Sequence, residues 1–183
     1  MKLLSAFTAL SFTLLVSSSG YSAELSQNRH LHEVDFENLP ASAMSCDDLI
    51  NPEPTLANPL SVGGLVLTDP VCLATGFCSS PTCMPDPDNV YGGNISVFLN
   101  PGGTIGFAGR AKIAVLDVQG NGDNPFALRV TDGRGRTYDV QRQAVLYGQV
   151  LVPVVSPRGI QTIEVLDVGG TGGPLAIAAV YYR

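Results

Sequence analysis

The sequence predicts an all-β protein that folds as an antiparallel β-sandwich with about nine or ten short strands. Glycine and proline are both plentiful, at 20 and 13 of 183 residues, and they interrupt the chain too often for long helices. Short apolar segments recur at the spacing of about 8–12 residues that is typical of sandwiches and barrels. An apolar content of 45% against 14% charged residues excludes a disordered chain.

The N-terminus has the pattern of a secretory signal peptide. Lys2 precedes a short apolar stretch, and small residues follow up to Ala23. The apolar stretch is shorter than a bilayer span. We therefore expect residues 1–23 to be removed on export, residues 24–32 to form a polar lead, and residues 33–183 to form one β-sandwich domain that is secreted, extracellular or periplasmic. We expect no membrane span in the mature chain.

The first half of this domain contains two predicted strands and one long irregular segment. "LHEVDFENL" alternates in polarity as a strand does, and "PLSVGGLVLTD" follows with a glycine pair that suggests a bulge. Residues 70–92 hold three cysteines and several prolines. A loop of this length in a compact domain is commonly functional or cross-linked.

From residue 94 onward, apolar segments and turn residues alternate regularly. "DGRG" has the composition of a hairpin turn, because Asp-Gly tolerates positive φ. The other predicted turns are "PGG", "QGNGDN", "SPRG" and "GGTGG".

Two similar segments, "VLDVQGNGDNPFALRV" from Val115 and "VLDVGGTGGPLAIAAV" from Val165, stand about fifty residues apart. Each is interpreted as a strand, a glycine-rich turn and a second strand, that is, as the same hairpin used twice. The first strand of each copy is apolar at both odd and even positions, which indicates that both faces of the strand are buried. Asp117 and Asp167 are predicted to accept hydrogen bonds from turn amides. The alternative role is that of calcium ligands.

Four cysteines in an exported chain predict two disulfides. The favoured pairing joins Cys78 to Cys83, which closes a short loop, and Cys46 to Cys72. The spacings lack the C-x2-C arrangement of a zinc site.

The formal net charge is −6, which argues against nucleic acid and anionic membranes as main partners. One local basic cluster contains Arg129, Arg134, Arg136 and Arg142. Because its centre is a predicted turn, it is interpreted as a solvated hairpin tip.

The order of the motifs resembles secreted jelly-roll domains of bacterial surface and exported proteins, including the extracellular part of PEP-CTERM-type proteins and the galactose-binding-like β-sandwiches. The segments that carry the resemblance are "VDFENLP", "VGGLVLTD", "PDPDNVY", "LRVTDGRGRTYDV", "VSPRGIQTIEVLD" and "LAIAAVYY". It implies a jelly-roll-type sandwich and a calcium site between an early Glu, which Glu37 matches, and an acid of the closing strand. Asp167 is the other candidate metal ligand. The closing strand "AIAAVYY" has no acid, and the family's sorting signal is missing.

Candidate ligand-binding residues lie in the irregular segment. Tyr91 stands near Asp86, Asp88 and Asn89, and an aromatic ring with planar polar groups is what sugar binding requires. Oxygen ligands at this density also suit calcium, although these residue types are common in turns. No other cofactor is expected. Asn94, in "NIS", is a glycosylation acceptor if the source is eukaryotic.

The sequence favours a secreted, non-catalytic binding or adhesion module for an extracellular glycan or protein. His30 and His32 are read as part of a polar terminal strand rather than a metal site, and no G-x-S-x-G elbow occurs. The alternatives are a structural or surface-associated protein without a small ligand, and a secreted hydrolase.

Overall fold

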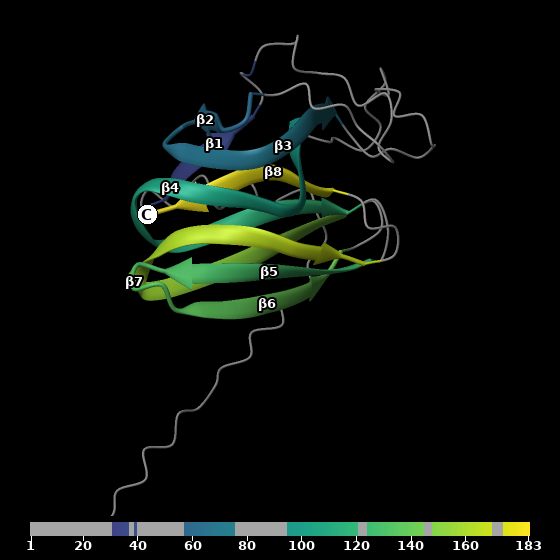
Figure 1. The fold of residues 1–183 in the computed structure, drawn as a ribbon. Helices are drawn as coiled ribbons and strands as arrows, with labels where there is room; N and C mark the ends of the chain where they lie inside the picture. The colour runs from purple at the N-terminus through teal and green to yellow at the C-terminus, as the bar shows by residue number, and fades with distance from the viewer. Residues whose placement is uncertain are drawn as a thin grey trace, which may run out of the picture.

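The computed structural model describes residues 31–36, 39, 57–75, 95–120, 124–144, 148–169 and 174–183, and these residues form strands and their connections (Figure 1). The strands are β1 (His32–Asp35), β2 (Leu60–Val62), β3 (Leu65–Thr75), β4 (Ile95–Gly120), β5 (Pro125–Asp132), β6 (Thr137–Gln143), β7 (Gly148–Val168) and β8 (Leu175–Tyr182).

All the strand pairings in this part of the chain are antiparallel. The strand order is β1-β8-β4-β7-β5-β6, and β3 joins the sheet through β4 and carries β2 at its other edge. The predicted all-β antiparallel fold is therefore confirmed, and it is consistent with a β-sandwich. The described residues contain eight strands rather than nine or ten, because two predicted turns lie inside strands.

The two misplaced turns are "PGG" and "SPRG", which lie within β4 and β7. In the β3–β4 pairing, residues 100–103 bulge out opposite the single residue Asp69. In the β4–β7 pairing, residues 156–159 bulge out in the same way opposite Lys112. Gly102 and Gly159 supply positive φ values of 91° and 86° at these bulges. Each glycine segment therefore bends a long strand without reversing it.

These bends let β4 and β7 contribute to one core from two parts of the sheet. The first part of β4 pairs with β3 and β8, its middle pairs with β3 and β7, and its last part pairs with β7 and β8. Apolar side chains from β1, β3, β4, β5, β7 and β8 belong to a single buried cluster. Its largest fully buried aliphatic side chains are Leu65, Leu67, Leu99, Ile105, Leu116, Leu128, Ile160, Ile163 and Ile177.

The twin segments are not hairpins, so this part of the prediction is wrong. β4 does not pair with β5, and β7 does not pair with β8. Instead, the second strand of each copy pairs with the first strand of the other: β5 lies beside β7, with Ala127 opposite Asp167, and β8 lies beside β4, with Ala179 opposite Asp117. The two copies therefore pair with each other within one sheet, and neither closes on itself. Burial on both faces holds for the first copy, whereas Asp167 in the second is exposed.

Candidate functional site

The turn between β5 and β6 is held by the carboxylate of Asp132. Its Oδ1 accepts hydrogen bonds from the backbone N–H groups of Arg134, at 2.8 Å, and Arg136, at 3.0 Å. The backbone N–H of Asp132 donates to the carbonyl oxygen of Arg136 at 2.8 Å. Gly135 supplies a φ of 74°. The predicted "DGRG" turn is therefore confirmed, and its aspartate fixes the direction in which the two arginines leave the backbone.

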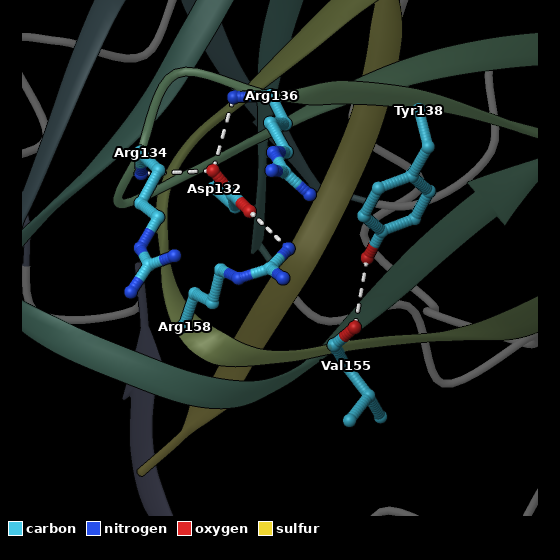
Figure 2. Close-up of polar contacts among 6 residues, drawn as sticks. All are labelled: Asp132, Arg134, Arg136, Tyr138, Val155 and Arg158. Carbon is cyan, nitrogen blue, oxygen red and sulfur yellow. Dashed lines mark hydrogen bonds and ion pairs between the residues drawn. The ribbon is translucent and has the colours of Figure 1, made fainter.

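The bend of β7 packs against this turn. The N–H of Gly133 donates to the carbonyl oxygen of Gly159 at 2.9 Å, and Arg158 Nη1 lies 3.6 Å from Asp132 Oδ2. Figure 2 shows Asp132 between the turn arginines and Arg158. The hydrogen bond from the Arg136 amide, with further contributions from the Arg134 amide and Arg158, holds the pKa of Asp132 below its ordinary value. The carboxylate is therefore ionised at neutral pH.

The same end of the molecule carries most of the positive charge of the chain. Arg110 lies in a second bend of β4, where residues 107–110 stand opposite Gln161, and it packs against Gly159. Arg183 pairs through its backbone with Ile113, beside Lys112. Figure 1 shows this second bend of β4, the bend of β7, the β5–β6 turn and the C-terminus at its left-hand end. We name this surface the cationic end. Its exposed residues, six of the ten lysines and arginines, are Arg110, Lys112, Arg134, Arg136, Arg158 and Arg183.

An aromatic side chain borders the cationic end. The hydroxyl of Tyr138, on β6, donates a hydrogen bond to the carbonyl oxygen of Val155, on β7, at 3.1 Å. This contact joins two strands that are not neighbours in the sheet. Partial burial raises the pKa of Tyr138 above its ordinary value, so the hydroxyl keeps its proton and remains a donor at neutral pH.

The sequence-predicted basic cluster is only partly the cluster that the fold assembles. Arg134 and Arg136 belong to both. Arg129 instead forms an ion pair with Asp139, with its Nε 3.0 Å from Oδ1, and Arg142 lies near the far end of β6. The remaining members of the cationic end come from segments distant in the sequence. No local pattern would have revealed them, because strand register alone places them beside the turn.

Among the described residues, the buried carboxylate of Asp117 has no hydrogen-bond partner. Its side chain lies on β4, and the residue is 1% exposed. Within the described part of the chain, neither carboxylate oxygen has a hydrogen-bond donor, and the Nε2 of the nearby Gln119 has no acceptor. Desolvation, and secondarily the charge of Glu33, raises the pKa of Asp117 to about 6. The predicted turn-capping role of Asp117 is therefore wrong.

Most of the other predicted site residues lie outside the described residues, namely Asp86, Asp88, Asn89, Tyr91, Glu37, Asn94, Cys46, Cys78, Cys83 and His30. Cys72 falls on β3. One ring nitrogen of His32 lies 3.2 Å from the carbonyl oxygen of Gly63, and the ring stacks edge-on with Tyr182. The residues that the structure describes include no group of three or more His, Cys, Asp or Glu arranged to hold a metal ion.

Comparison with known proteins gives no family for this chain. No protein-family model matches it, and a search of curated proteins found no match. In the described ranges, no helix has the length and apolar character needed to cross a membrane.

Proposed function

We propose that the protein is a secreted, non-catalytic binding module that takes an anionic extracellular ligand at the cationic end. The observation that carries the proposal is the gathering of six exposed basic residues at one end of a chain whose formal net charge is −6. Charge segregation of this kind attracts and orients an anionic ligand toward one surface. The N-terminal signal pattern supports an extracellular ligand.

The arginines of this surface are held in a defined arrangement. Asp132 holds the backbone of Arg134 and Arg136 through its Oδ1, while Arg158 lies beside Oδ2. A backbone fixed before binding loses less conformational freedom when the ligand arrives. Guanidinium groups also present parallel N–H donors that match carboxylate, sulfate or phosphate oxygens. The arrangement therefore favours specific anion binding over diffuse attraction.

Charge reversal at the turn tests this proposal. We expect Arg134→Glu to weaken binding of the mature protein to immobilised dextran sulfate about tenfold, which corresponds to the loss of a charge-assisted contact. Figure 2 shows the Arg134 side chain directed away from Asp132, so the variant leaves the contacts of the turn in place. Affinity is measured by biolayer interferometry at two salt concentrations.

The matched control is Arg142→Glu, because it makes the same change in net charge at an exposed arginine near the far end of β6. We expect its affinity to stay within about twofold of that of the unaltered protein, since it removes no contact at the cationic end. Equal losses in the two variants would mean that only the net charge matters, and the proposal would be wrong.

A further inference from the structure

Two exposed apolar side chains, Tyr138 and Val155, lie beside the cationic end. Among the described residues, Tyr138 and Val155 are the large hydrophobic side chains that are exposed, at 40% and 59%. They are joined by the hydrogen bond between the Tyr138 hydroxyl and the Val155 carbonyl oxygen. Isolated exposed apolar residues are common on proteins, but these two adjoin the charged cluster.

The tyrosine ring and the charged groups come from adjoining pieces of the chain. Arg136 directly precedes β6 and stands two residues before Tyr138, and its carbonyl oxygen accepts the cross-strand hydrogen bond from the backbone N–H of Asp132. Val155 directly precedes the bend of β7 that contains Arg158. Figure 2 shows the Arg136 side chain between the Asp132–Arg158 pair and the Tyr138 ring. In this view Tyr138, Arg136 and Arg158 follow one another across the site.

Both arginines keep donors for a ligand. Oδ1 of Asp132 is used by the turn amides, and Arg158 approaches Oδ2 at 3.6 Å, which is longer than a hydrogen bond. The side chain of Arg158 is 44% exposed, and a guanidinium has five N–H donors. A second carboxylate can therefore be bound at this point.

An aromatic ring beside arginines matches one chemical class of ligand. A sugar ring presents C–H groups that pack on an aromatic face, and a uronic acid adds a planar carboxylate that arginine binds with two parallel hydrogen bonds. A sulfate or phosphate on a flexible chain would use the arginines alone. We infer that the cationic end binds a uronic acid unit of an acidic polysaccharide, with Tyr138 against the sugar ring and Arg136 and Arg158 on the carboxylate.

This inference rests on the proposed function and names its ligand class. The experiment compares three probes by isothermal titration calorimetry: a galacturonate oligosaccharide, its methyl ester and poly(vinyl sulfate), a polyanion without sugar rings. We expect galacturonate to bind at least tenfold more tightly than the ester, which lacks the charge. Tyr138→Ala should weaken galacturonate binding about tenfold, because the sugar ring loses the aromatic face on which it packs, and should leave poly(vinyl sulfate) binding unchanged.

Two further variants keep the test decisive. Tyr138→Phe keeps the ring and is expected to retain galacturonate binding within about threefold. Tyr138→Leu keeps apolar bulk without an aromatic face and should behave as Tyr138→Ala does, which separates stacking from loss of fold. Equal affinity for galacturonate and its ester, or equal effects of Tyr138→Leu on both polyanions, overturns the inference. If neither polyanion binds the unaltered protein, the proposed function fails as well.

Discussion

Asp117→Asn is expected to stabilise the protein by about 2 kcal/mol at pH 7.5. At that pH the unaltered carboxylate is ionised, because burial raises its pKa only to about 6, and an ionised group without donors is costly to bury. Asparagine has nearly the same shape and carries no charge. The free energy of unfolding is measured by chemical denaturation.

The pH dependence gives a sharper form of this prediction. The folded-state pKa of Asp117 lies above the ordinary value of 3.8, so the native state binds the proton more tightly than the unfolded state. The contribution of Asp117 to the free energy of unfolding is therefore most favourable below about pH 4. It decreases as the pH rises to about 6, and the pH dependence follows this one titration. The stabilisation by Asp117→Asn should appear over the same interval and vanish below it.

The repeat provides the control. Asp167 occupies the matching position in the second copy, but it is exposed, so Asp167→Asn should change stability by no more than about 0.5 kcal/mol. A destabilised Asp117→Asn variant at pH 7.5, or the same small effect for both substitutions, would show that Asp117 is not a buried, uncompensated charge.

Gly133→Ala is expected to destabilise the protein by about 1–3 kcal/mol, the range for forced overpacking. A Cβ atom at this position would lie 2.7 Å from the carbonyl oxygen of Arg158, and backbone on both sides would have to shift. The shift would also disturb the hydrogen bond from Gly133 to Gly159. Because this contact holds the turn against the bend of β7, polyanion binding should weaken together with stability.

Gly109→Ala is the matched control, because an added Cβ there meets nothing within 4 Å and the backbone needs no positive φ. We expect unchanged binding and a melting temperature within about 2 °C of that of the unaltered protein. If the Gly133→Ala and Gly109→Ala variants have the same melting temperature and bind the polyanion with equal affinity, the contact between the turn and the bend does not organise the cationic end.

The sequence predicts those parts of the fold that depend on local chemistry. The short apolar segments appear as strands, and the Asp-Gly pair at Asp132 forms the expected turn. "PGG" and "SPRG" also consist largely of turn-forming residues but occur at bulges, because pairing with β3 and β4 continues on both sides of them. Glycine content indicates that the backbone changes direction there, but long-range pairing decides whether the strand ends.

The candidate site depends on long-range pairing to a greater degree. The twin segments pair with each other's second strands, whereas a local interpretation closes each as a hairpin. The cationic end likewise joins Arg110, Arg158 and Arg183 to the turn across wide sequence separations. Neither the burial of Asp117 nor its lack of a donor can be inferred from its copy, since Asp167 has the same neighbours in sequence and is exposed.

The location of ligand binding tests the central claim most directly. A galacturonate oligosaccharide is titrated into the isotopically labelled mature protein, and backbone and arginine side-chain resonances are followed by NMR. We predict the largest shift changes at Arg134, Arg136, Tyr138 and Arg158, with little change at Arg142. Binding whose largest changes fall on the segment from Asp86 to Tyr91, with the cationic end unaffected, would contradict the account.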